Sequence, residues 1–179
     1  MNRPLLYMDV DGVINAWAAR GDHPENFELT FAAVAADGRG YPMRVPVGTR
    51  ERVGVLQARF EIVWATTWAH DAVRVLAPQF GFGGDWPVLE LDGVERHPLA
   101  PRPRMSGPHT PKLSPILHHA GDRPLVWVDD EMTRDAMQAI SRRNRDVAPS
   151  LIVKPKPAGG LADRHMRHLI AFADAHTTA

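Results

Sequence analysis

The stretch Leu5-Leu6-Tyr7-Met8-Asp9-Val10-Asp11-Gly12-Val13 stands near the start of the chain and decides the fold. Four apolar residues run directly into a pair of aspartates, which is typical of a fully buried strand that ends in a polar turn. Such a strand belongs in the centre of a parallel sheet. Because side chains two residues apart on a strand share a direction, Asp9 and Asp11 are expected to face one site.

Strands and helices alternate along the rest of the chain. Short apolar runs predict further strands at residues 61–65, 87–91, 125–128 and 151–153. Helices are predicted at about residues 50–59, 68–77, 112–119, 132–143 and 161–175. We expect Thr49 to cap the first helix and Pro78 to end the second. This alternation predicts an α/β fold with a doubly wound, mostly parallel sheet.

Residues 27–47 follow a different pattern, in which apolar and polar side chains alternate on both sides of Asp37-Gly38-Arg39-Gly40. The Asp-Gly pair supplies the positive backbone dihedral angles that a tight turn needs, so we expect a β-hairpin here. The chain is interpreted as one domain over residues 1–179, with this hairpin flap inserted at about 15–48. The last residues, 177–179, are expected to be disordered.

The overall composition restricts the chemistry. Lys plus Arg and Asp plus Glu both total 21, so no global field attracts nucleic acid or an anionic membrane. The chain has no cysteine, which excludes disulfides, thiolate catalysis and cysteine-based zinc sites. The apolar run before Asp9 is too short for a signal peptide or a membrane span. We therefore expect a cytoplasmic protein without a membrane partner.

Polar residues follow three of the predicted strands, namely Asp9 and Asp11, Thr66 and Thr67, and Asp129 and Asp130. Ligands of a doubly wound sheet bind outside the carboxyl ends of its strands, where these residues would meet. Four acidic side chains gathered there would repel one another without a cation. Carboxylate and carbonyl oxygens with water are the ligands that magnesium prefers. The sequence therefore predicts a Mg²⁺ site, with Lys112 available to neutralise further charge.

Taken together, these motifs resemble those of the haloacid dehalogenase (HAD) superfamily of hydrolases. The first motif of that superfamily, Asp-x-Asp-x-Thr/Val, matches residues 9–13. Its later motifs are matched in the same order by Thr66, Lys112 and the pair Asp129-Asp130. The resemblance spans roughly residues 4–155. Dehalogenases lack the second aspartate of the first motif, so Asp11 favours the phosphatases of the superfamily.

The resemblance implies a magnesium-dependent phosphohydrolase that cleaves a phosphate monoester through an aspartyl-phosphate intermediate. Asp9 would attack the phosphorus, while Asp11 would protonate the leaving oxygen and then activate the hydrolytic water. Thr66, or its neighbour Thr67, would bind a phosphoryl oxygen, and Lys112 would offset negative charge.

The same resemblance implies the ligands of the metal. Magnesium would be held by Asp9, by the main-chain carbonyl of Asp11 and by Asp129, with Asp130 as a further ligand or as support for the others. Many relatives carry a large cap domain that closes over the substrate. The intervals after the first motif and before Lys112 are too short for one, so a comparatively open site is expected.

Several of these residues also have plain structural interpretations. Thr66 can cap the helix that follows it, and the acidic residues at 129–131 suit the N-terminus of a helix. Three tryptophans flank the motifs, at Trp64, Trp68 and Trp127. We expect them mainly in the core, with packing around the site or stacking on an aromatic substrate as the alternative.

Two other functions stay open. One is a non-catalytic domain that binds phosphate or a protein partner, although the order of the motifs favours the hydrolase. The other is a nucleic-acid end-processing phosphatase, because a Pro-rich loop before Lys112 carries the basic residues Arg96, His97, Arg102, Arg104 and His109. The class of the phosphorylated substrate, whether metabolite, protein or nucleic-acid end, and the oligomeric state are left open by the sequence.

Overall fold

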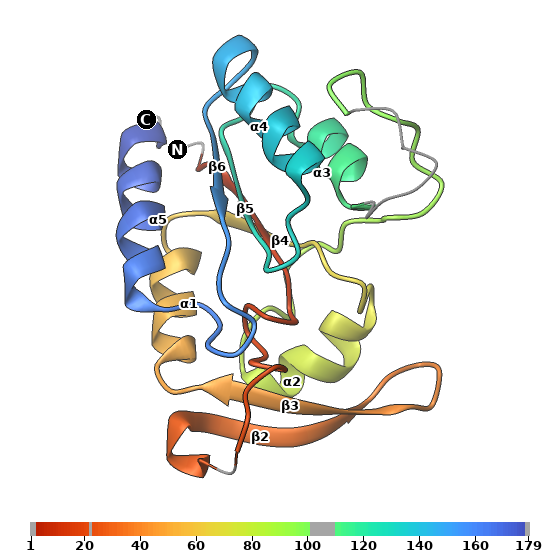
Figure 1. The fold of residues 1–179 in the computed structure, drawn as a ribbon, viewed down its shortest axis with the longest axis vertical. Helices are drawn as coiled ribbons and strands as arrows, with labels where there is room; N and C mark the ends of the chain where they lie inside the picture. The colour runs from red at the N-terminus through yellow and green to blue at the C-terminus, as the bar shows by residue number, and fades with distance from the viewer. Residues whose placement is uncertain (1–2, 22, 101–109, 178–179) are drawn as a thin grey trace.

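The computed structural model describes residues 3–21, 23–100 and 110–177. Four parallel strands form its central sheet (Figure 1), namely β1 (Leu5–Met8), β4 (Glu61–Trp64), β5 (Leu125–Val128) and β6 (Ser150–Val153). Their order in the sheet is β4-β1-β5-β6, and all three pairings are parallel. β1 is completely buried between two neighbours, as its unbroken apolar run predicts.

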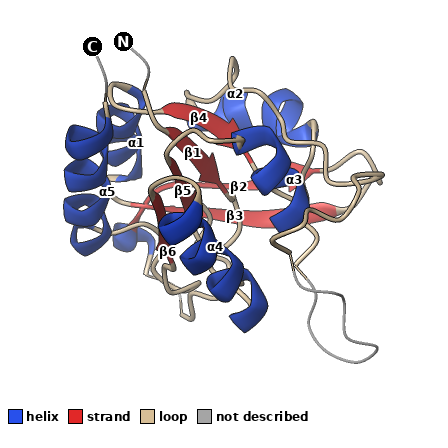
Figure 2. Ribbon diagram, turned by 90° about the horizontal axis from the view of Figure 1, so that it is seen from above, coloured by secondary structure: helices blue, strands red, loops and turns tan. Residues whose placement is uncertain are grey.

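Helices cover both faces of this sheet, as Figure 2 shows. Leu6 and Met8 of β1 pack on the face that carries α1 (Thr49–Gln57) and α5 (Asp163–His176). Leu5 and Tyr7 pack on the opposite face, under α3 (Leu113–Ala120) and α4 (Arg134–Asp146). The expectation of an α/β fold built on a parallel sheet is therefore confirmed.

The predicted hairpin is also present. β2 (Phe27–Val34) follows a 3₁₀ turn, η1 (Pro24–Asn26), and pairs antiparallel with β3 (Gly40–Pro46) as a separate two-stranded sheet. Gly38 in the connecting turn has a φ of 79°, a conformation that glycine adopts without strain. Asp71 fastens the turn end to the body, because its Oδ2 accepts a hydrogen bond of 2.7 Å from the main-chain N–H of Ala36.

Two of the predicted elements differ from those in the structure. The helix expected to stop at Pro78 instead runs as a π-helical stretch, η2 (Ala72–Leu76), directly into α2 (Ala77–Phe80). Pro78 lies in the first turn of α2, directly after the π-helical stretch, so it marks a change of helix type and does not end the helix. The strand expected at residues 87–91 is reduced to one bridge between Val88 and Trp64.

The expected cap of α1 is a third difference. Gly48 occupies the N-cap position and Thr49 is already helical, with its hydroxyl donating to the carbonyl of Pro46 at 2.7 Å. The carboxylate of Glu28 in β2 accepts hydrogen bonds of 2.9 Å from the N–H groups of Gly48 and Arg50. The hairpin therefore supplies the acceptors that the helix N-terminus needs.

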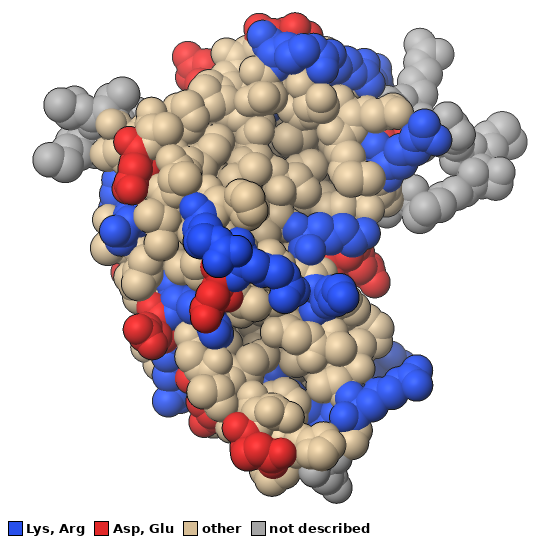
Figure 3. Space-filling model, turned by 60° about the vertical axis from the view of Figure 1, so that its left-hand side comes forward, with Lys and Arg blue, Asp and Glu red and all other residues tan. Residues whose placement is uncertain are grey.

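The remaining helices and strands lie within a few residues of their predicted bounds. Of the C-terminal residues expected to be disordered, Thr177 caps α5 through its hydrogen bonds to Ala173, while residues 178–179 lie outside the described range. No helix in the described part of the chain is long and apolar enough to cross a membrane. Basic and acidic side chains are interspersed over the face shown in Figure 3, in keeping with a net charge of zero.

Candidate active site

The candidate site lies at the carboxyl ends of β1 and β5. These two strands are neighbours, but the chain leaves β1 toward α1 on one face of the sheet and leaves β5 toward α4 on the other. Such a reversal is the point at which doubly wound sheets bind their ligands. Asp9 directly follows β1, and Asp129 directly follows β5.

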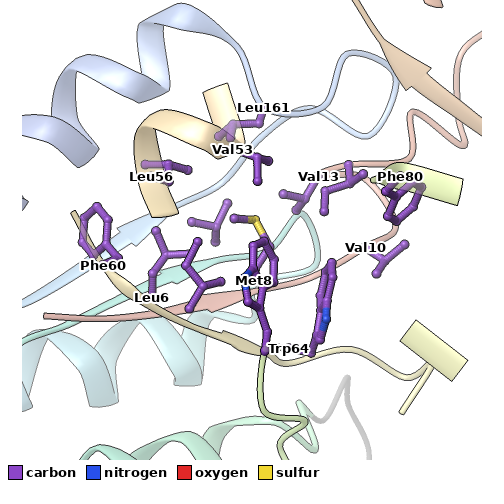
Figure 4. Close-up of a cluster of buried hydrophobic side chains, with 14 of the residues drawn as sticks. Leu6, Met8, Val10, Val13, Val53, Leu56, Phe60, Trp64, Phe80 and Leu161 are labelled. Atoms are coloured by element: carbon purple, nitrogen blue, oxygen red, sulfur yellow. The ribbon is translucent and has the colours of Figure 1, made fainter. Parts of the chain in front are cut away.

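The turn after β1 is fixed by its apolar residues. Val10 and Val13 belong to the same buried cluster as Met8 (Figure 4). Asp9 and Asp11, on either side of Val10, instead line the cavity at the sheet edge. The carbonyl of Val10 accepts hydrogen bonds of 2.9 Å from the N–H groups of Ile14 and Asn15. A tight, packed turn thus sets the directions of both aspartates.

Lys112 joins the two strand ends. Its Nζ lies 2.6 Å from Oδ2 of Asp9 and 2.7 Å from Oδ2 of Asp129. All three residues are more than nine-tenths buried. Asp9 also accepts a hydrogen bond from the N–H of Val10 at 2.7 Å, and Asp129 accepts one from the N–H of Glu131 at 2.8 Å. The ammonium therefore holds two carboxylates from different strands at one point.

Asp130 brings a third carboxylate to this point. One oxygen each of Asp9, Asp129 and Asp130 lies within 4.8 Å of the other two. Gly12 makes room for the approach: its φ is +72°, and a Cβ there would lie 2.1 Å from Cγ of Asp130. The glycine of the first motif is thus needed for both its backbone conformation and its missing side chain.

Negative charge exceeds positive charge in this cluster. Burial raises the pKa of Asp9, an effect that Lys112 opposes and Asp129 reinforces. Burial likewise raises the pKa of Asp130. Burial acts to lower the pKa of Lys112, but the two carboxylates outweigh it and the pKa is raised, which keeps the ammonium charged. Three buried carboxylates around one ammonium call for another cation or a proton.

The donor atoms of the cluster suit a hard divalent cation. Carboxylate oxygens are the ligands of magnesium, and the chain offers no thiolate to attract a softer metal. In the described residues, the main-chain carbonyl of Asp11 accepts no hydrogen bond from another main-chain group. One oxygen each of Asp9, Asp129 and Asp130 could therefore hold a hard divalent cation.

Asp11 is held apart from that cluster by two other donors. Nδ2 of Asn15 donates to Oδ1 of Asp11 at 2.7 Å, and Nε1 of Trp68 donates to its Oδ2 at 2.9 Å. The residue is only partly buried. Asp9 and Asp11, two residues apart, thus share one site but have different partners and different access to water.

A cavity of about 1010 Å³ opens onto all of these aspartates. Its lining residues are Asp9, Asp11, Asn15, Trp17, Tyr41, Pro42, Thr67, Thr110, Pro111, Lys112, Asp129, Asp130, Glu131, Met132, Thr133, Arg134 and Lys154. Thr67 belongs to the lining, whereas Thr66 is buried and its hydroxyl accepts a hydrogen bond from the N–H of Trp68 at 3.4 Å. Thr66 does not cap the following helix as expected, because the N-cap of η2 is Asp71 and no side chain caps it.

The sequence did not single out the residues that form the rim of the cavity. Trp17 is 52% exposed, and its Nε1 lies 3.4 Å from Oδ2 of Asp130. Tyr41 reaches the site from β3, because the hairpin returns alongside the turn after β1 through a hydrogen bond of 2.8 Å from Ala16 N to Arg44 O. A contact between such distant segments leaves no local pattern in the sequence.

Two of the basic residues in the Pro-rich loop, Arg96 and His97, do not line the cavity. Arg96 donates to the carbonyl of Ala100, and His97 packs edge-on against His118. Arg102, Arg104 and His109 lie outside the described residues. Among the described residues, the basic side chains that line the cavity are Lys112, Arg134 and Lys154.

Comparison of the chain with models of protein families, with curated proteins and with solved structures found no match in any of the three. The function must therefore be inferred from the residues of the cavity and their geometry.

Proposed function

We propose that this protein is a magnesium-dependent phosphohydrolase of the HAD type, which cleaves a phosphate monoester through an aspartyl-phosphate on Asp9. The observation that carries the proposal is the buried ion-pair cluster at the switch point of the sheet, where Lys112 bridges Asp9 and Asp129 at 2.6 and 2.7 Å. A fold does not need this cluster for stability, since buried ion pairs are costly to desolvate. Such charges gather where chemistry requires them.

Asp9, Asp129 and Asp130 are the residues that would hold Mg²⁺, together with the carbonyl of Asp11. When bound, the ion neutralises excess charge and polarises a phosphoryl oxygen. Lys112 keeps a fixed positive charge beside the attacking carboxylate, which lowers the repulsion between that carboxylate and an incoming phosphate. Among the threonines, Thr67 lines the cavity and is the better candidate for a phosphoryl contact.

The reaction divides into two transfers. In the first, an oxygen of Asp9 forms a bond to phosphorus while the bond to the leaving oxygen breaks, and Asp11 gives that oxygen its proton. In the second, the Asp11 carboxylate takes a proton from water, and the water oxygen displaces Asp9 from phosphorus. Inorganic phosphate leaves, and both aspartates return to their starting states.

The rim of the cavity suggests how a substrate enters. Trp17, Tyr41 and Pro42 border the site from the hairpin side, and no large cap covers the opening in the described residues. The hairpin is therefore a partial flap, and a sizeable substrate can fill the rest of the opening itself.

One observation favours a nucleic-acid end as this sizeable substrate, which is the second candidate function. Arg134 lines both the main cavity and a further cavity of about 460 Å³ on the outer face of α4. Ser141, Arg142 and Arg145 continue that face. The helix rises about 1.5 Å per residue, so these donors would follow a phosphate backbone for roughly 16 Å from the site.

A direct assay tests the proposal. Wild-type protein is incubated with 4-nitrophenyl phosphate, once with MgCl₂ and once without it. The same assay is then repeated with the Asp9→Asn variant. Turnover that requires magnesium and is abolished by Asp9→Asn supports the enzyme. Phosphate binding without turnover would support the non-catalytic domain instead. For the second candidate, 5′- and 3′-phosphorylated oligonucleotides are compared with free nucleotides, and equal rates would rule out the nucleic-acid end.

A further inference from the structure

Both carboxylate oxygens of Asp11 are engaged by donors from different segments of the chain. Asn15, four residues later, donates to Oδ1 at 2.7 Å, and Trp68, after β4, donates to Oδ2 at 2.9 Å. A carboxylate oxygen has two lone pairs, so each donor leaves one lone pair of its oxygen for a proton or a substrate. The side chain is therefore fixed in orientation without being blocked.

The hairpin fixes both of these donors in turn. Oδ1 of Asn15 accepts a hydrogen bond of 2.9 Å from the N–H of Arg44, and its Nδ2 lies 3.4 Å from the carbonyl of Pro42. The indole of Trp68 packs edge-on against the ring of Tyr41, with ring centres 5.3 Å apart. Residues 41–44 of β3 thus determine where both donors point.

We infer that Asn15 and Trp68 are positioning residues, which hold Asp11 for proton transfer to and from the substrate, and that strand β3 of the hairpin sets their orientation. The inference rests on the proposed function. It assigns the hairpin a part in catalysis beyond bordering the cavity: the flap aligns the acid and base of the reaction. Asp9 needs no such support, because Lys112 and the N–H of Val10 already fix it.

The physical reason is the sensitivity of proton transfer to distance. A general acid typically contributes about 10² to 10⁴ in rate, and a misplacement of about 1 Å can remove about 10² of it. A half-buried aspartate without partners would rotate about its two side-chain torsions. The donors suppress that rotation, so the proton of Asp11 is delivered to the leaving oxygen along one direction.

Two phosphate esters separate positioning from a merely structural role. An alkyl phosphate needs a proton on its leaving oxygen, whereas 4-nitrophenyl phosphate releases a stabilised anion and needs none. The ratio kcat/KM reports the steps up to the first irreversible one, the transfer of phosphoryl to Asp9. Loss of proton donation therefore lowers kcat/KM for the alkyl ester alone, while general damage to the site lowers it for both.

Trp68→Phe is the informative variant, because it keeps an aromatic ring against Tyr41 and removes only the indole donor. We expect it to lower kcat/KM for the alkyl phosphate about tenfold or more and that for 4-nitrophenyl phosphate less than about twofold. Asp11→Asn should show the same pattern more strongly. Trp86→Phe is the matched control: its indole packs on Trp64 in the core, with ring centres 4.6 Å apart, and it should not change the ratio of the two values.

A second readout does not depend on turnover. The indole N–H resonance of Trp68, identified by its loss in Trp68→Phe, should shift in Asp11→Ala, while that of Trp86 stays in place. An unshifted Trp68 resonance overturns the inference. So does a Trp68→Phe protein that lowers both kcat/KM values equally or leaves both unchanged while the wild type is active. A wild type that hydrolyses neither ester overturns the proposed function itself, and the inference with it.

Discussion

Nζ of Lys112 lies 2.6 Å from Oδ2 of Asp9, although the two residues are 103 positions apart in the chain. The same ammonium contacts Asp129, so its removal would leave two buried carboxylates facing each other. We expect Lys112→Met to lower the free energy of unfolding of the metal-free protein by about 3 kcal/mol and to abolish the proposed phosphatase activity. Urea denaturation measures the first effect.

Lys156→Met is the control for this change, because Lys156 is exposed and its loss should alter stability by less than about 0.5 kcal/mol. If Mg²⁺, like Lys112, reduces the repulsion between the buried carboxylates, added MgCl₂ should restore part of the stability that Lys112→Met loses. Equal stability of Lys112→Met and the wild type, both measured without metal, would show that Asp9 and Asp129 are not two buried negative charges paired with Lys112.

Magnesium is expected to stabilise the folded protein. An ion that binds only the folded state at 100 times its dissociation constant adds about 2.7 kcal/mol, which appears as a rise in Tm. Asp129→Asn should remove this rise, because it deletes a charged ligand. Asp85→Asn, at an exposed position outside the cavity, should keep it. Thermal unfolding with MgCl₂ and with EDTA measures the difference.

Gly12→Ala tests the same metal site by displacing a ligand, Asp130, without changing any of the carboxylates. The new Cβ would lie 2.1 Å from Cγ of Asp130, and the backbone there has a φ of +72°. Asp130 must then move away from Asp9 and Asp129. We expect a weaker response of Tm to magnesium as well as a loss of stability. A Gly12→Ala protein with an unchanged magnesium response would exclude Asp130 as a ligand.

How far these features follow from sequence depends on the range of the contacts. β1 could be predicted because its four apolar residues are buried on both faces, a local signal. The strand expected at residues 87–91 shows the limit of that signal. Pro87 has no N–H, and the segment joins the sheet only where Leu89 N donates to Trp64 O and Pro87 O accepts from Trp64 N, at 2.8 Å each.

The residues of the candidate site also differ in whether a local pattern in the sequence marks them. The aspartates and Lys112 were predicted because they follow strands or begin a helix, positions that the sequence marks. Trp68 was expected mainly as a core residue, and its bond to Asp11 spans 57 positions. Its contacts with Asp11 and Tyr41 depend on where β3 returns over the sheet edge, and no periodicity within either segment encodes that packing.

Arg143 carries a prediction about stability alone. It is 1% exposed and has four main-chain or hydroxyl acceptors, the carbonyls of Gly121, Arg123 and Ala148 and the hydroxyl of Ser150. Arg143→Met keeps the length of the side chain but leaves these buried acceptors unpaired. We expect it to lower the free energy of unfolding by about 3 kcal/mol or more, whereas Arg142→Met on the exposed face should change it little.

The pair Tyr7 and His119 predicts how stability depends on pH. The hydroxyl of Tyr7 lies 2.7 Å from Nδ1 of His119, a contact in which the neutral ring can accept the hydrogen bond. Burial lowers the pKa of His119, an effect that Glu61 opposes and Arg123 reinforces. The folded state therefore resists protonation of this ring.

The direction of the effect follows from that lowered pKa. Below about pH 6.5, the ordinary pKa of histidine, His119 binds a proton in the unfolded chain but stays neutral in the folded chain. Stability therefore falls as the pH falls. Above that pH the ring is neutral in both states and contributes no slope. His119→Gln can still accept from Tyr7 but does not titrate. We expect urea denaturation to show a smaller loss of stability between pH 7 and about pH 5.5 for His119→Gln than for the wild type. Equal losses would mean that the other histidines account for the whole dependence.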